Sequence, residues 1–290
     1  ALYGGAADLA PSTKTEIKNG GDFSAENYAG RNFHFGVREL AMSVIANGMA
    51  VYGGCIPYTS TFFVFSDFMK PGIRLAALQK LRSIYVFTHD SFYVGEDGPT
   101  HEPVEQLAML RTIPGMTVIR PAEAHEVAHA WAYAVRSKTP VALILTRQDI
   151  APYDEETAAK VDVSKGAYVV SEDSAYDTIL IATGSEVNTA LGAAHILRET
   201  GRRIRVVSMP SRELFLAQDQ EYRDSVLPPA CEKRVTIEAG STFGWERFAG
   251  NNGLCIGLDH FGASAPYKVL AEKFGFTPEA VAEKISKFFA

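Results

Sequence analysis

Seven short apolar runs rich in β-forming residues recur along the chain, and amphipathic helical stretches separate them. Strands that are apolar throughout must be buried on both faces, so this alternation is typical of parallel sheets with helices packed on each side. The runs lie at residues 83–89, 116–121, 141–147, 177–184, 204–210, 234–240 and 254–258. The predicted fold class is therefore α/β.

The clearest helix pattern covers residues 35–54 and stops at Gly53 and Gly54. Its apolar residues follow the i, i+3, i+4, i+7 spacing of a helix with one apolar face. They are Val37, Leu40, Ala41, Val44, Ile45, Gly48 and Met49. Similar patterns at 123–137 and 185–201 predict two more helices, and Gly201 stands where a left-handed residue commonly ends a helix.

A polar stretch at residues 148–165 has no sustained apolar period and predicts a linker. We expect an α/β domain at residues 1–150, a linker at 151–165 and a second, smaller parallel-sheet α/β domain at 166–290, all of ordinary size. The chain opens with ALYGGAADLAPS, which has the pattern of a strand end running into a loop. We therefore expect a fragment or one half of a split protein.

Charge and cysteine content exclude several function classes. The formal net charge is −6 and the Lys and Arg residues are scattered, so neither a nucleic acid nor a membrane is expected as a partner. The three cysteines lie far apart and form no C-x-x-C pair, which argues against a disulfide framework and a zinc site and favours a reducing, cytoplasmic setting. No apolar run approaches the roughly 18 residues that span a bilayer.

The stretch HDSFYVGEDGPTHEP, residues 89–103, follows a predicted strand and places ionisable side chains among glycines and prolines. Ligands of parallel sheets bind beyond the carboxyl ends of the strands, so this loop is a candidate site. Residues 183–186, TGSE, are a weaker candidate for a phosphate cradle. The chain lacks the nucleotide-binding glycine motifs and the G-x-S-x-G of a hydrolase elbow.

Three interpretations fit the side chains of the loop. Asp97, Thr100 and Glu102 can cap the helix that is expected to start near residues 100–103. His89, Asp97 and His101 can bind a metal, although their spacing follows no established pattern. The same groups can bind a polyol or phosphate, with imidazoles as donors and Asp97 as acceptor.

Candidate residues outside the loop are equally open at this level. Glu39 lies near the start of the helix at 35–54 but off its apolar stripe, which is typical of an exposed residue that the helix dipole favours. Phe62, Phe65 and Phe68 have a spacing that usually belongs to a core. Arg147 follows an apolar run and is either an ion-pair partner or an anion-binding group.

The motifs taken together resemble the transketolase family over nearly the whole chain. The segments are GGAADLAPS, HFGVRELAM, YTSTFFVF, THDSFYVGEDGPTHEPVEQLAMLR, LTRQ, IATGSEV and VVSMPS, in the family's order. The resemblance implies the pyrimidine-binding domain of a thiamine diphosphate enzyme followed by the family's carboxy-terminal domain. It implies transfer of a two-carbon ketol unit from a ketose phosphate to an aldose phosphate, a reaction of the pentose phosphate pathway.

The resemblance also implies roles for individual residues. Glu39 matches the glutamate that hydrogen-bonds N1′ of the aminopyrimidine ring, and it is expected to be catalytic together with His101. The cofactor contacts are Asp8, Glu39, Phe62, Phe65 and Phe68, the last often a tyrosine in the family. The expected substrate contacts are Ser12, His89 and Arg147 for the sugar phosphate, and Asp97 and His101 for the sugar hydroxyls.

The family holds the diphosphate and its Mg²⁺ or Ca²⁺ on a separate amino-terminal domain through a Gly-Asp-Gly motif, which the chain lacks. No metal ligand is therefore expected in the chain itself, and we expect it to have little or no activity alone. The implied partners are that missing half, phosphorylated ketoses and aldoses, and a second copy in a homodimer. The alternatives are a deoxyxylulose phosphate synthase or dehydrogenase beta-type thiamine enzyme, and a non-catalytic assembly module.

Overall fold

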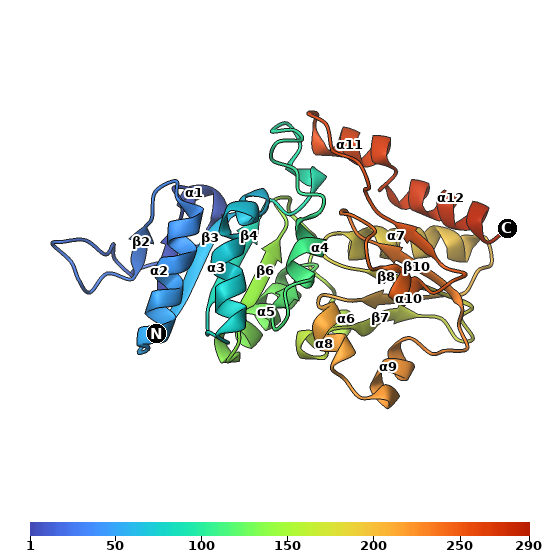
Figure 1. Cartoon of the computed structure of the whole chain (residues 1–290). Coiled ribbons are helices and arrows are strands. Elements are labelled where there is room, and N and C mark those ends of the chain that lie inside the picture. The colour runs from blue at the N-terminus through green and yellow to red at the C-terminus, as the bar shows by residue number, and fades with distance from the viewer.

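The structure, a computed structural model, describes residues 1–290 and contains two β-sheets (Figure 1). The first sheet has six strands in the order β2-β1-β3-β4-β6-β5, and every neighbouring pair is parallel. Its strands are β1 (Leu2–Ala6), β2 (Asn32–His34), β3 (Ile56–Phe62), β4 (Ile84–Thr88), β5 (Thr117–Ile119) and β6 (Val141–Leu145). The apolar runs at 83–89, 116–121 and 141–147 thus form the strands that the sequence predicts.

Helices cover both faces of this sheet because its central strands are apolar on both sides. In β4, Tyr85 and Phe87 belong to one core cluster, and Ile84 and Val86 belong to another. This alternation follows from the two-residue period of a strand. The helical elements are α1 (Ala10–Thr13), α2 (Glu39–Tyr52), η1 (Phe63–Phe65), α3 (Ser66–Leu78), η2 (Phe92–Val94), α4 (Gln106–Arg111) and α5 (Ala124–Arg136). Residues of α2, α3 and α4 pack with Tyr85 and Phe87, whereas α5 packs on the opposite face.

The buried face of α2 is not the apolar stripe that the spacing predicts. Its buried residues are Glu39, Met42, Ser43, Ala46 and Asn47. The predicted stripe instead faces solvent, with large exposed side chains at Val37, Leu40, Val44 and Ile45. The polar groups face inward because they have partners there: Asn47 donates to the Gly72 carbonyl oxygen of α3 at 2.8 Å and accepts from the Tyr85 hydroxyl at 3.1 Å.

The second sheet has five strands in the order β11-β10-β8-β9-β7. Its strands are β7 (Tyr168–Glu172), β8 (Thr178–Ala182), β9 (Ile204–Ser208), β10 (Lys233–Ile237) and β11 (Leu254–Ile256). Four of them match predicted runs and are parallel. The edge strand β7 pairs with β9 in the antiparallel direction, so the sheet is mixed rather than wholly parallel.

Helices also cover both faces of the second sheet. They are α7 (Glu186–Glu199), α8 (Arg212–Leu216), α9 (Gln220–Val226), α10 (Glu246–Ala249), α11 (Tyr267–Phe274) and α12 (Pro278–Phe288). Buried residues of α7 and α12 share one core cluster, and Phe215 of α8 and Phe248 of α10 lie in another. The predicted end of α7 is confirmed, since Gly201 has a φ of +87°.

One core cluster joins the two sheets. It contains Val86 and Leu143 of the first sheet together with Leu180 and Val206 of the second. The polar stretch between them holds two short helical turns, α6 (Glu155–Ala158) and η3 (Val163–Lys165), and buries Tyr153 against this shared core. The two chain termini lie at opposite ends of the molecule (Figure 1). None of the helices combines the length and apolar character needed to cross a membrane.

Candidate active site

The candidate residues of the first domain gather at the carboxyl edge of its sheet. The strand order β2-β1-β3-β4-β6 brings five strand ends side by side there. Asp8 and Ser12 follow β1, Glu39 follows β2, Phe62 ends β3, His89 follows β4 and Arg147 follows β6. Segments that are far apart in the sequence thus supply one continuous edge, as expected for a ligand site of a parallel sheet.

Glu39 is buried, with 8% of its surface exposed, so its interpretation as a surface residue is wrong. It is the first residue of α2, where the helix dipole favours a negative charge. Its Oε1 lies 3.5 Å from the Thr61 hydroxyl on β3, a long hydrogen bond. A buried carboxyl group with so weak a partner retains most of its capacity to hydrogen-bond a ligand.

The phenylalanines form a row of rings rather than a core. The Phe62 and Phe65 rings are nearly parallel, with centroids 6.3 Å apart and an interplanar angle of 7°. Phe68 continues the row 6.2 Å from Phe65 but is 62% exposed, so the core interpretation is wrong for it. The fully buried phenylalanine of residues 62–68 is Phe63. The His101 ring approaches the Phe65 ring edge-on at 5.6 Å, which links the row to the loop at 89–103.

Backbone conformation, ring stacking and a hydrogen bond all constrain His89. It has a φ of +60°, uncommon for a residue with a side chain, and its ring stacks on Phe62 at 3.7 Å. Its Nδ1 shares a hydrogen bond of 2.9 Å with the Thr88 hydroxyl. Burial and then the positive charge of Arg147 lower the pKa of His89 to about 4, although Asp97 opposes them. The imidazole is therefore neutral at pH 7.

The electrostatic neighbours of His89 show that the loop and β6 converge. Arg147, Asp97 and His101 all act on its pKa. Arg147 is exposed, and no carboxylate lies within ion-pair distance of its guanidinium group, so it is not an ion-pair partner. Asp97 is also exposed, and the Nδ1 of His101 shares a hydrogen bond with the Thr100 hydroxyl. A cationic donor, two imidazoles and a carboxylate therefore border the same space.

The capping interpretation of the loop is wrong. The following helix, α4, begins at Gln106 rather than near residues 100–103, and its first turn has no side-chain cap. Glu102 is buried and precedes the first residue of α4 by four positions, so it does not occupy the capping position. The structure contains no group of three or more His, Cys, Asp or Glu residues that could hold a metal ion. Of the three interpretations, the geometry favours the polyol or phosphate site.

Asp8 and Ser12 lie at the outer part of the edge, on the segment that follows β1. Both are exposed, and Asp8 has a φ of +58°. Ser12 belongs to the short helix α1, which packs next to β3. Their exposure leaves both side chains accessible to a ligand.

Sequence reasoning missed a buried charge network directly behind His89. Asp90 forms an ion pair of 2.8 Å with Arg120, which also pairs with Glu186 of the second domain. The TGSE turn at 183–186 is thus occupied by the Arg120 guanidinium group and is not a free phosphate cradle. The available signal was the position of Arg120 at the end of the predicted strand at 116–121.

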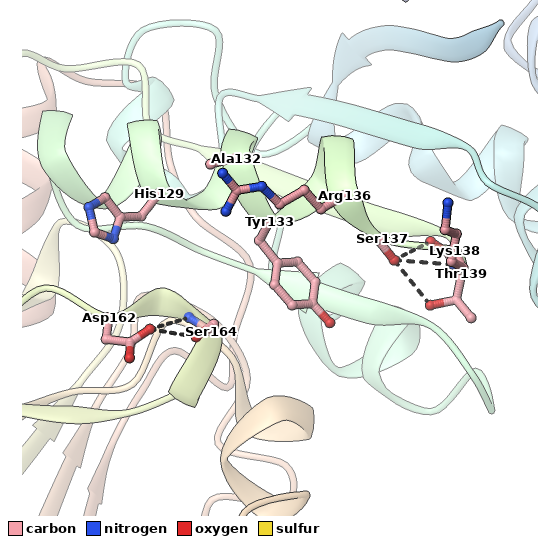
Figure 2. A pocket seen from close by; sticks show the side chains of 9 residues that line it. All are labelled: His129, Ala132, Tyr133, Arg136, Ser137, Lys138, Thr139, Asp162 and Ser164. Carbon is pink, nitrogen blue, oxygen red and sulfur yellow. Dashed lines mark hydrogen bonds between the residues drawn. The ribbon is translucent and has the colours of Figure 1, made fainter.

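A cavity of about 660 Å³ lies at a different place, between the end of α5 and the turn before β7 (Figure 2). Its basic residues are His129, Arg136 and Lys138. Arg136 lies in the last turn of α5, where the helix dipole favours a positive charge, so this residue does not require an anionic ligand. The cavity also borders Thr139, which precedes β6, and it therefore lies at the edge of the sheet opposite the candidate site.

Family models match both halves of this architecture. Residues 1–152 match the transketolase pyrimidine-binding domain, and residues 166–277 match the transketolase-like carboxy-terminal domain. The chain belongs to the transketolase family. The α/β class with two domains of these types is thereby confirmed.

Curated relatives match the whole of this transketolase-family chain. The transketolase of Aquifex aeolicus is 52% identical over 293 residues, which cover 100% of the chain and 42% of the relative. The transketolase of Geobacillus stearothermophilus is 53% identical and covers 98% of the chain and 43% of the relative. The chain therefore spans about two fifths of the length of these relatives.

Solved structures agree with this assignment. A transketolase from Leishmania mexicana is 44% identical with a TM-score of 0.93, covering 99% of this chain and 42% of that one. A Pichia stipitis transketolase structure in complex with xylulose 5-phosphate is 39% identical with the same TM-score, covering 99% and 43%. A split-gene transketolase, described as an inactive β4 tetramer, is 25% identical with a TM-score of 0.79, covering 99% of this chain and 91% of that one.

Proposed function

We propose that the carboxyl edge of the first sheet is the pyrimidine and substrate half of a transketolase active site. The observation that carries the proposal is the buried Glu39 carboxyl group, which has one long hydrogen bond and lies on the same sheet edge as the Phe62–Phe65 rings and His89. A flat, partly apolar ring with a polar nitrogen fits this combination of parallel aromatic rings and an unfilled carboxyl acceptor. The residues present therefore fit the pyrimidine end of thiamine diphosphate.

Glu39 and the aromatic row have separate roles in this proposal. Thiamine diphosphate, when bound, supplies the electron sink for cleaving the bond beside a ketose carbonyl. Glu39 holds a proton at N1′ of the pyrimidine ring, while Phe62, Phe65 and Phe68 give that ring an apolar wall and exclude water. Asp8 contributes a polar contact at the outer part of the edge.

The loop at 89–103 and Arg147 bind the sugar phosphate. Arg147 supplies the permanent charge for the phosphate, since the low pKa of His89 leaves its imidazole as a neutral hydrogen-bond partner at pH 7. Ser12 adds a hydroxyl donor from the other side of the edge. Asp97 accepts from a sugar hydroxyl, and His101 moves a proton at the hydroxyl beside the reacting carbonyl.

The remaining half of the site belongs to an amino-terminal domain of the family, which also holds the diphosphate and its Mg²⁺ or Ca²⁺. The chain has no Gly-Asp-Gly motif for this purpose. The division into domains at 1–150 and 166–290, with a linker at 151–165, and a place in the pentose phosphate pathway are parts of the same proposal. Three free cysteines support a reducing, cytoplasmic setting.

A second copy of the chain is the proposed partner of the exposed apolar face of the first domain. This face covers α2 and α3 and consists of Val37, Leu40, Val44, Ile45, Val51, Tyr52, Phe68, Leu75 and Leu78. Exposed apolar patches of this kind mark protein interfaces, and Phe68 makes this one continuous with the aromatic row. Sedimentation of the native chain and of Val44→Asp tests the homodimer, because a monomer in both would exclude it.

An activity assay with the missing half tests the proposed function. The chain alone is expected to have little or no ketol transfer from xylulose 5-phosphate, and activity is expected when the amino-terminal portion of a relative is supplied. In that reconstituted enzyme, Glu39→Gln should lower kcat by a factor of about 100 or more, while the exposed control Glu26→Gln should not. Unchanged activity of Glu39→Gln would favour an assembly module, and a preference for pyruvate would favour a different thiamine enzyme.

A further inference from the structure

The loop at 89–103 contacts the second domain at its start and at its tip, and the chain just beyond the loop contacts it again. Near its start, the buried Phe92 ring contacts Phe274 and Phe276 with centroids 5.3 and 5.1 Å apart. At its tip, the Ser264 hydroxyl donates to the Glu96 carbonyl oxygen at 2.6 Å. Just beyond its end, the Ser241 amide donates to the carbonyl oxygen of Val104 at 2.9 Å. The loop belongs to the first domain by sequence but rests on the second.

Buried charges tie the start of the loop to the second domain. The Arg120 Nε donates to Asp90 at 2.9 Å, and its Nη1 donates to the Thr183 carbonyl oxygen at 3.0 Å. Glu186 completes the group through an ion pair with the same Nη1. All four residues are almost wholly buried, so Arg120 has little freedom to leave its partners.

A second arginine ties the helix that follows the loop to the same place. Arg111 of α4 donates to Glu238 of the second domain with both Nη atoms, at 2.7 and 2.8 Å. The Thr183 hydroxyl donates to the same carboxylate at 2.7 Å and accepts from Arg120 at 2.9 Å. Thr183 therefore joins the two arginine groups, one beside the start of the loop and the other on the helix that follows it.

We propose that the second domain sets the shape of the loop at 89–103, and that Arg120 is the positioning residue for His89. Arg120 holds Asp90, which directly follows His89 in the sequence. His89 has a left-handed backbone with a φ of +60°. Such a conformation persists where the surroundings fix it. The role of the loop in binding substrate rests on the proposed function, whereas its dependence on the second domain does not.

Gly184 offers a way to displace Arg120 without removing its charge. An added Cβ at Gly184 would lie 2.5 Å from the Arg120 Cζ, and Gly184 has a φ of +55°. Gly201 is a matched control in the same domain, because its φ is +87° and an added Cβ would meet nothing within 4 Å. Both Gly→Ala variants are destabilised by an alanine in the left-handed conformation, but only Gly184→Ala displaces Arg120.

Hydrogen exchange of the native chain and of the two variants tests the proposal. Amides of residues 89–103 are expected to exchange about ten times faster in Gly184→Ala and to stay within about twofold of the native rate in Gly201→Ala. If Gly184→Ala loosens only the second domain, or if it unfolds and Arg120→Lys leaves exchange of 89–103 unchanged, the proposal is wrong. This measurement needs neither cofactor nor substrate, so it stands even if the proposed function fails.

Kinetics of the reconstituted enzyme separate positioning from general stability. Gly184→Ala should raise the KM for a phosphorylated donor about tenfold, with a smaller change for an unphosphorylated donor that does not reach His89. An equal change for both donors would contradict a positioning role of Arg120 toward His89. Absence of activity in every reconstituted chain, the native one included, would instead count against the proposed function.

Discussion

The carboxyl edges of both sheets carry charged side chains, which include exposed, unpaired ones at the first edge and buried, paired ones at the second. In the first domain, Arg147 and Asp97 at this edge are exposed, and Arg147 has no carboxylate partner. In the second domain, Thr183, Glu186 and Glu238 at the equivalent edge are buried, and each has a partner from the first domain or from its own. Topology therefore tells where a ligand can bind, but the neighbouring domain decides whether that edge is open.

The charge states at the two edges differ in the same way. Burial alone would raise the pKa of Glu238, but the positive charge of Arg111 and its hydrogen bonds outweigh it and lower the pKa to about 2. At the open edge, burial and Arg147 lower the pKa of His89 to about 4, so it carries no charge at pH 7. At the second edge each of these charged groups has a protein partner of opposite charge, whereas at the first edge Arg147 has none and can bind an anionic ligand.

Replacing the arginine of each edge by methionine gives the largest expected contrast. Arg120→Met leaves Asp90 and Glu186 buried without a cation and should lower the free energy of unfolding by about 3–5 kcal/mol. Arg147→Met removes an exposed side chain and should change it by no more than about 0.5 kcal/mol. Denaturant unfolding of the two variants measures the difference.

Unlike its small effect on stability, the effect of Arg147→Met on ligand binding should be large. Arg147→Met is expected to weaken binding of a phosphorylated sugar in the reconstituted enzyme, because it removes the permanent charge of the phosphate site. If both substitutions lowered the free energy of unfolding equally, the first edge would not differ from the second in having an unpaired arginine. An undiminished affinity of Arg147→Met would remove Arg147 from the proposed site.

The sequence allowed the open edge to be predicted better than the filled one. His89 and Arg147 follow predicted strands, so their place at the sheet edge could be predicted from local pattern. The local pattern of Glu39 predicted an exposed residue, and the roles proposed for all three rest on the family resemblance. The pair of Arg120 and Glu186 could not be predicted from local pattern, because its members are separated by 66 positions in different domains and no periodic pattern links them. In the sequence, Arg120 is only an arginine at the end of a predicted strand, and Glu186 belongs to a turn that resembles a phosphate cradle.

The missed secondary structure has equally local causes. The strand β3 reads IPYTSTF, and its Thr and Ser residues interrupt the apolar run although they are buried. The predicted orientation of α2 was wrong because the prediction assumed that the apolar residues at helical spacing face the core. Here Asn47 has inward hydrogen-bond partners, and the apolar stripe is left to face outward.

Glu102 shares features of both edges, because it belongs to the loop of the first edge but is buried like the carboxylates of the second. Its protonation gives stability a pH dependence, which is a smaller expected effect. It lies in the ligand loop but is buried against the second domain, where an added Cβ at Gly262 would touch its carboxyl group. No side chain hydrogen-bonds this carboxyl, and burial raises its pKa from 4.5 to about 7, although backbone groups of Ala263 and Gly95 oppose the shift. In this respect Glu102 resembles the buried carboxylates of the second edge, but without their arginine.

The native chain should therefore lose stability as the pH rises from about 4.5 to about 7. In that range the unfolded chain gives up the Glu102 proton and the folded chain keeps it, so the free energy of unfolding falls, by an amount on the order of 2 kcal/mol. Glu102→Gln should remove this part of the pH dependence, whereas Glu96→Gln, an exposed neighbour in the same loop, should leave it in place. Thermal unfolding of the three proteins between pH 4 and 8 measures it. Parallel curves for the native chain and Glu102→Gln would mean that the Glu102 carboxyl is solvated, and that this part of the loop belongs to the open edge.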